Sequence, residues 1–202
     1  MNWVSSRALT GAALITVTLL GPPAVAQTTQ QVAWCEGKGG ATLDQQISGC
    51  TAMIESGKFS GANLAVPFNN RGDAYIWKGN YDRAIADLNE AIRLNPKSSS
   101  AYNSRAVGYK AKGDYDRAVA DLNEVIRLKP KTADYFFNRG VVYGAKGDND
   151  RAIADYNETI RLNPKFAMAF YNRGLVKQKK GDAAGGGADI AKARAIQPGI
   201  GQ

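Results

Sequence analysis

Four prolines at a constant spacing limit what this chain can fold into more than any other feature of its sequence. The spacing is 34 residues each time, and the prolines are Pro96, Pro130, Pro164 and Pro198. The residues before them are also repeated, since segments 82–96 and 150–164 are nearly identical. Self-similarity at a period of this length is the signature of a protein built from stacked, equivalent units.

Each unit predicts two helices joined by a tight turn, and the units fall at 65–98, 99–132, 133–166 and 167–200. A glycine near the middle of the unit, such as Gly79, supplies the left-handed residue that ends the first helix. The next residue, such as Asn80, is a good N-cap for the second helix. The proline then stops that helix, because it lacks an N–H and clashes with the preceding turn. The predicted fold class is therefore all-α, an α-solenoid.

Small and aromatic residues recur at fixed positions of the unit. Gly72 and its equivalents face Ala84 and its equivalents, so the two helices of a unit can approach closely. Aromatic residues such as Tyr102 and Tyr109 are expected to fill the spaces between layers, as core and not as a cofactor site. Each pair exposes an apolar face that the next pair covers.

This small and aromatic pattern at a period of 34, closed by proline, resembles the tetratricopeptide repeat (TPR) family over residues 65–200. The resemblance implies a right-handed superhelix whose first helices line a concave groove. It also implies a scaffold or adaptor that binds a peptide or protein partner there. The TPR subset that captures C-terminal carboxylates uses a lysine and an asparagine where this chain has Asn69 and Asp73, which argues against carboxylate capture.

The resemblance also places the groove-facing residues. They are Val66, Asn69, Asp73, Trp77, Asn103, Val107, Lys110, Asp134, Phe137, Val141, Met168, Tyr171 and Leu175. Phe137, Val141, Tyr171 and Leu175 are expected to form an exposed apolar strip, and such strips mark contact surfaces. The alternative is that the C-terminal helix or a neighbouring molecule covers the strip.

Residues 1–26 predict a signal peptide. One basic residue, Arg7, precedes an uncharged apolar run, and Ala24-Val25-Ala26 has the small residues that signal peptidase requires. We expect cleavage between Ala26 and Gln27, a periplasmic or secreted protein, and no stable membrane insertion afterwards. The alternative is a short membrane anchor, for which the apolar run is too short.

Residues 27–64 keep the length of a unit but depart from its pattern, as terminal capping units do. Segment 44–56 is expected to be the second helix of this unit. The only two cysteines, Cys35 and Cys50, lie here, and in an exported chain they predict a disulfide; two buried thiols are the alternative. At the other end, Gly185, Gly186 and Gly187 are expected to fray the last helix.

Two ladders of charged residues run through the units. Arg71, Arg105, Arg139 and Arg173 are matched by Asp87, Asp121, Asp155 and Asp189. We expect them to form partly buried ion pairs within or between units, the alternative being a clamp for anionic ligands. Lys78, Lys112, Lys146 and Lys180 precede the turn glycines. They are interpreted as partners of the helix dipole, the alternative being a site for polyanions.

Catalytic chemistry has little support. The chain has no histidine and two cysteines. Its carboxylates recur in every unit, whereas a catalytic pair is expected at one place in the chain. We expect no enzyme activity, no metal and no cofactor.

The net charge is +8, or +7 once Arg7 is removed with the signal peptide. This charge favours acidic partners or anionic envelope surfaces. We expect no nucleic-acid partner, since an exported protein rarely meets nucleic acid. The predicted function is a protein-binding scaffold in the bacterial envelope. The alternative is a structural protein that docks on anionic polymer or lipid.

Overall fold

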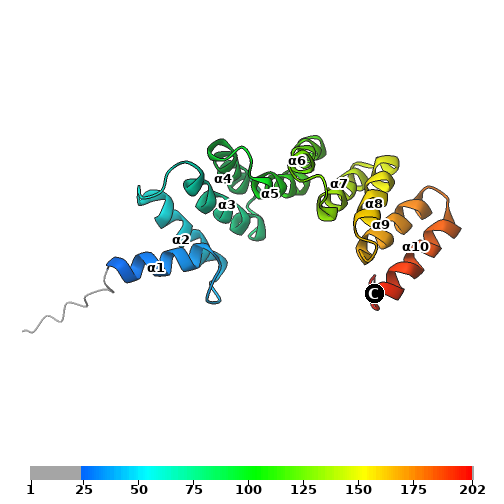
Figure 1. Ribbon diagram of the computed structural model, residues 1–202, viewed down its shortest axis with the longest axis horizontal. Coiled ribbons are helices and arrows are strands. Elements are labelled where there is room, and N and C mark those ends of the chain that lie inside the picture. Colours follow the sequence, from blue (N-terminus) through cyan, green and yellow to red (C-terminus); the bar gives the residue numbers. More distant parts are fainter. Residues whose placement is uncertain (1–23, 202) are drawn as a thin grey trace, which may run out of the picture.

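The computed structural model describes residues 24–201, which form helices and no strand. The helices follow one another in chain order along a curved, elongated row (Figure 1). Their bounds are α1 Ala24–Cys35, α2 Leu43–Glu55, α3 Gly61–Trp77, α4 Tyr81–Leu94, α5 Ser99–Ala111, α6 Tyr115–Leu128, α7 Ala133–Lys146, α8 Asn149–Leu162, α9 Ala167–Lys179 and α10 Ala183–Ile196. The predicted solenoid of helical pairs is confirmed.

The predicted signal peptide lies almost wholly outside the described residues, and its expected cleavage point falls within α1.

The turn between the two helices of a unit follows the predicted chemistry. Gly79, Gly113, Gly147 and Gly181 all have positive φ, between 73° and 93°. Directly after them, the N-cap side chains accept hydrogen bonds from backbone N–H groups in the first turn of the second helix, as Asp114 does from Arg117 at 3.1 Å. Asn80, Asp148 and Asp182 do the same. These caps satisfy donors that the helix itself leaves unpaired.

The core of each unit depends on a close approach of its two helices. A Cβ added at Gly72 would lie 2.8 Å from Leu88 Cγ, and one added at Gly140 would lie 2.8 Å from Tyr156 Cε1. Real Cβ atoms almost never come this close to another atom, so even alanine would force its neighbours to move at these two positions. Leu88, Leu122 and Tyr156 fill the space on the second helix and are almost fully buried.

The predicted disulfide is confirmed. Cys35 ends α1, Cys50 lies in α2, and their sulfur atoms are bonded at 2.07 Å. Thr42 begins α2 with a capping box, in which its hydroxyl accepts from Gln45 N–H while the Gln45 side chain accepts from Thr42 N–H. The disulfide therefore ties together the first helical pair among the described residues.

The predicted fraying of the last helix is wrong, because α10 runs unbroken through its three glycines. The glycines let α9 and α10 cross closely. A Cβ at Gly186 would lie 2.6 Å from Gly174 O, and one at Gly174 would lie 2.7 Å from Gly186 O. Packing at this crossing compensates for the low helix propensity of glycine.

The arginine ladder forms the predicted ion pairs, and they join units as well as helices. Arg105 donates to both carboxylate oxygens of Asp121, at 2.9 and 2.6 Å, and its third nitrogen donates to Asn89 of the preceding unit at 2.7 Å. Tyr102 lies under the same guanidinium. The other pairs repeat this geometry: Arg71 with Asp87, Arg139 with Asp155 and Arg173 with Asp189. Because all four arginines of this ladder are paired with aspartates, an anion clamp formed by them has no support here.

The lysine ladder makes contacts that the spacing of the lysines does not predict. Lys112 pairs with Asp82, in the first turn of the preceding second helix. Lys146 pairs with Asp116, Lys180 with Asp150, and Lys78 with Asp44 of the N-terminal pair. These exposed pairs link successive units along one edge of the stack.

Candidate functional site: a row of pockets along the first helices

Three pockets follow one another along the first helices of the repeats. They lie between α3 and α5, between α5 and α7, and between α7 and α9, and we call them the first, central and third pockets. Val141 lines both the central and the third pocket, so these two pockets are neighbours. We use the term groove for the surface that carries the three pockets.

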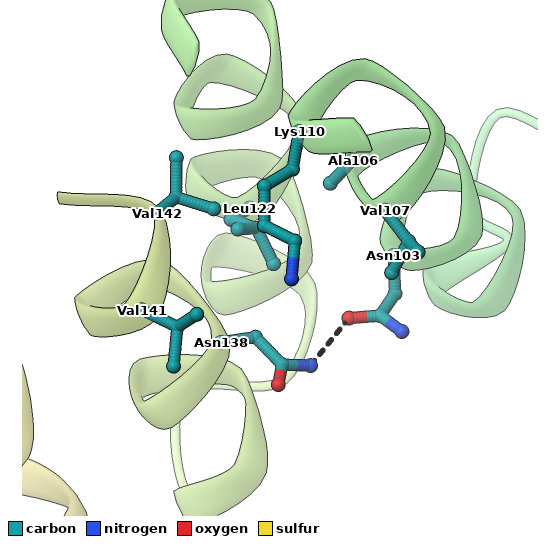
Figure 2. A pocket seen from close by; sticks show the side chains of 8 residues that line it. All are labelled: Asn103, Ala106, Val107, Lys110, Leu122, Asn138, Val141 and Val142. Carbon is teal, nitrogen blue, oxygen red and sulfur yellow. Dashed lines mark hydrogen bonds between the residues drawn. The ribbon is translucent and has the colours of Figure 1, made fainter. Parts of the chain in front are cut away.

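The central pocket, of about 40 Å³, brings together four of the predicted groove residues: Asn103, Val107, Lys110 and Val141. Figure 2 shows their side chains converging from α5 and α7. Asn138 Nδ2 donates a hydrogen bond to Asn103 Oδ1 at 2.9 Å across the pocket. Lys110 makes no ion pair within the described residues. The pocket therefore combines aliphatic walls with amide groups and one uncompensated cation.

The third pocket is larger, about 210 Å³, and contains the predicted residues Val141 and Leu175. Its other lining residues are Gly144, Asn149, Tyr156, Asn172, Val176 and Lys179. Burial raises the pKa of Tyr156 to about 12, and a hydrogen bond with Asn172 offsets part of this effect. The Tyr156 phenol is therefore neutral at ordinary pH and keeps its proton for hydrogen bonding.

The first pocket, of about 140 Å³, contains the predicted residues Val66 and Asn69. Asn69 Nδ2 donates to Asp73 Oδ2 at 3.1 Å. Burial raises the pKa of Asp73, although hydrogen bonds from Ser104 and Asn69 act in the opposite direction. The Asp73 carboxyl, which was predicted to face the groove, is thus hydrogen-bonded to neighbouring side chains of the protein.

The remaining predicted residues do not form one surface with the pockets. Trp77, at the end of α3, is 79% exposed, Met168 and Asp134 are exposed, and none of the three lines the pockets described above. The predicted apolar strip is narrower than expected. Of its four members Leu175 alone is exposed, at 43%.

Two members of the strip are partly covered by the protein itself. The Phe137 ring packs on the Phe166 ring, with centroids 4.9 Å apart. Tyr171 packs against a cluster that contains Ile200, next to the C-terminal end. The C-terminal residues thus cover part of the strip, which corresponds to the alternative considered for it.

Sequence reasoning missed the amides of Asn138 and Asn172, although each lines a pocket. The signal was present, because one position of the unit is polar in all four repeats, as Asn70, Ser104, Asn138 and Asn172. A polar column on an otherwise apolar helix face indicates a surface that needs hydrogen bonds.

Nothing in the described part of the chain resembles a metal or membrane-spanning site. No group of three or more histidine, cysteine or acidic side chains among residues 24–201 is arranged to hold a metal ion. Within the same residues, no helix has the length and apolar character needed to cross a bilayer.

Comparisons with known proteins agree with this architecture. A family model described as TPR repeat matches residues 108–147 and 142–181, and one described as tetratricopeptide repeat matches residues 65–98. Together these matches cover more than half of the chain. No curated protein sequence matches the chain.

Several solved structures share the fold. A crystal structure of MamA superposes with a TM-score of 0.72 at 23% identity, over 81% of this chain and 93% of that one. MamA from Desulfovibrio magneticus RS-1 gives 0.74 at 16% identity, over 88% and 96%. YrrB, described as a TPR protein with an unusual peptide-binding site, gives 0.65 at 20% identity, over 78% and 79%. At these identities the likeness establishes the fold alone.

Proposed function

The chain belongs to the tetratricopeptide repeat family, and from this premise we propose that it is a non-enzymatic scaffold that binds an extended segment of a partner protein in its groove. Proteins of this family are typically interaction scaffolds, and the structural neighbour YrrB is described as having a peptide-binding site. The proposal places the partner segment along the first helices, across the central and third pockets.

The observation that supports this most is that these two pockets adjoin and have similar linings. They share Val141, and each offers aliphatic walls, an asparagine amide and a lysine without an ion-pair partner in the described residues. An extended peptide presents alternate side chains and backbone amides, so it needs both apolar contacts and hydrogen-bonding groups at regular intervals. The repeat supplies both once per unit.

We further propose that the protein works in the bacterial envelope or outside the cell. The apolar N-terminal segment with its small-residue cleavage motif supports export. The Cys35–Cys50 disulfide is compatible with it, because such bonds persist in oxidising compartments.

The alternative function, docking on anionic polymer or lipid through a basic surface, has less support. The lysines of the edge ladder are all paired with aspartates, so they do not present free positive charge. Binding by the remaining exposed charges would be screened within about 10 Å at 0.1 M salt.

Site-specific photo-cross-linking tests the proposal. A photoreactive amino acid is placed at Val107 or Leu175 in the groove, and at the exposed positions Ala120 or Ala154 on the second helices. The variants are expressed in the source organism and irradiated. The proposal predicts a discrete cross-linked protein at the groove positions and none at the controls. Cross-links at the controls alone would place binding on the other face.

A further inference from the structure

The third repeat departs from its neighbours at three positions. Gly144 stands where the first two repeats have Ile76 and Lys110, Asn149 where they have Tyr81 and Tyr115, and Tyr156 where they have Leu88 and Leu122. All three departures line the third pocket. Gly144 and Asn149 are smaller than the residues at the equivalent positions, and Tyr156 brings a hydroxyl group where the first two repeats have leucine.

Gly144 contributes no side chain to the third pocket. In the second repeat its equivalent, Lys110, lies in a pocket of about 40 Å³, whereas the third pocket measures about 210 Å³. A Cβ at Gly144 would lie 3.8 Å from the Tyr156 hydroxyl, an ordinary contact, so glycine is not required there by packing. Its effect is to leave the floor of the pocket open over the phenol.

The polar atoms of the pocket have unused hydrogen-bonding capacity. Asn149 Oδ1 is buried and has no donor among the described residues. Lys179, on the opposite helix α9, has no ion-pair partner there either. Because Asn149 lines the pocket, an occupant with a donor that reached this oxygen would satisfy it.

These groups select the occupant. The aliphatic walls, Val141, Leu175 and Val176, suit an apolar side chain, and the volume suits one large residue, since whole small-molecule sites begin at about 300 Å³. A complementary occupant would have a hydrogen-bond donor near Asn149 and a hydrogen-bond acceptor near Lys179. A carboxylate offers no donor, an ammonium is repelled by Lys179, and phenylalanine offers neither group. A side-chain amide offers both but little apolar surface for the aliphatic walls, whereas a phenol offers both on an apolar ring.

We propose that the third pocket receives a tyrosine side chain of the partner segment. This inference rests on the proposed groove function and specifies its recognition chemistry. The tyrosine ring lies between Val141 and Leu175, and its hydroxyl donates to the Asn149 amide oxygen and accepts from the Lys179 ammonium group.

The test uses N-acetyl-tyrosinamide as a probe, with N-acetyl-phenylalaninamide and N-acetyl-glutaminamide for comparison. Amide resonances of the ¹⁵N-labelled, disulfide-bonded protein are followed by NMR during titration. We expect the tyrosine probe to shift Gly144, Leu175 and Val176 and to bind at least fivefold more tightly than either comparison probe. Equal affinity of the tyrosine and phenylalanine probes would overturn the inference, as would tighter binding of the glutamine probe.

Variants of the pocket residues, with a matched control, show whether the probe binds in the third pocket. Gly144→Lys restores the residue of the second repeat and should abolish binding, whereas Ala154→Lys adds the same charge on the exposed side of α8 and should not. Asn149→Ala should lower affinity for the tyrosine probe to that of the phenylalanine probe. Groove cross-links without tyrosine selectivity would refute this inference and leave the proposed function standing. Absence of groove cross-links would refute the function itself.

Discussion

At the scale of single residues, the two charged ladders differ in how far sequence could predict them. Arg105 and Asp121 lie in the same unit and recur together, so their pairing follows from the repeat. Lys112 and Asp82 lie in different units, 30 residues apart, and meet because of how successive units rotate against each other. Sequence spacing does not contain that rotation, so these partners emerged from the structure alone.

The Arg105–Asp121 pair should be among the most sensitive positions of the protein. Asp121 is 5% exposed, and its removal leaves the guanidinium of Arg105 half-buried without its bidentate partner. Asp121→Ala should lower the free energy of unfolding by about 3 kcal/mol. Glu124→Ala, which breaks the exposed pair with Arg127, should cost less than about 1 kcal/mol. Urea denaturation of both variants checks this, and similar midpoints would contradict it.

Asp73 should make stability depend on pH. Burial raises its pKa in the folded state, so folding favours the protonated acid. The stabilising contribution is complete below the unfolded pKa of about 3.9 and is lost as pH rises through the folded pKa. Asp73→Asn should therefore match the unmodified protein near pH 3 and exceed it in stability near pH 7. Urea titrations of both proteins at both pH values test this. If the difference in unfolding free energy between the two proteins were the same at about pH 3 and about pH 7, the prediction would be wrong.

At the scale of helices, the pair α9 and α10 shows that helix propensity alone does not predict whether a helix is continuous. Three consecutive glycines predict a frayed helix, yet α10 is continuous, because Gly186 and Gly174 let it cross α9 at backbone contact distance. The three glycines are not equivalent. Gly186 meets Gly174 O, whereas a Cβ at Gly187 would meet nothing within 4 Å.

Alanine substitutions at two adjacent glycines should have opposite effects. Gly187→Ala adds helix propensity without a contact and should stabilise the protein by about 1 kcal/mol. Gly186→Ala should destabilise it, because the new methyl group would lie 2.5 Å from Gln178 Cγ and 2.6 Å from Gly174 O. Thermal denaturation followed by circular dichroism measures both. A shift of the melting temperature in the same direction for the two variants would rule out the close-crossing explanation.

The N-terminal pair should depend on its disulfide more than the rest of the stack does. The bond closes a loop of 15 residues between Cys35 and Cys50, which corresponds to about 3 kcal/mol in the chain-entropy account. A Cys35→Ser, Cys50→Ser variant should lose hydrogen-exchange protection in α1 and α2 while α5 to α8 keep theirs, since stability in such stacks is local. Uniform loss along the chain would show that the stack unfolds as a single unit.

At the scale of the whole molecule, the repeat period, the turn residues and the stacking of helical pairs could all be predicted from sequence, because they are local or recur at a fixed spacing. The groove was predicted less well. Val107, Lys110 and Val141 do converge, but Phe137 packs on Phe166 and Tyr171 packs near Ile200. Phe166 and Ile200 hold the last position of their units, where the first two units have Ser98 and Thr132. Tertiary contacts of this kind decide which groove positions stay free.

The central claim, that the function resides in the groove, is tested most directly by binding measurements with the cross-linked partner segment. Two double variants with equal added charge are compared by isothermal titration calorimetry: Val107→Glu with Leu175→Glu in the groove, and Ala120→Glu with Ala154→Glu on the exposed faces of α6 and α8. The groove variant should keep its helical circular dichroism and bind at least a hundredfold more weakly, equivalent to about 2.7 kcal/mol. The other variant should bind as the unmodified protein does. Unchanged affinity in the groove variant, or loss in the other, would contradict the account.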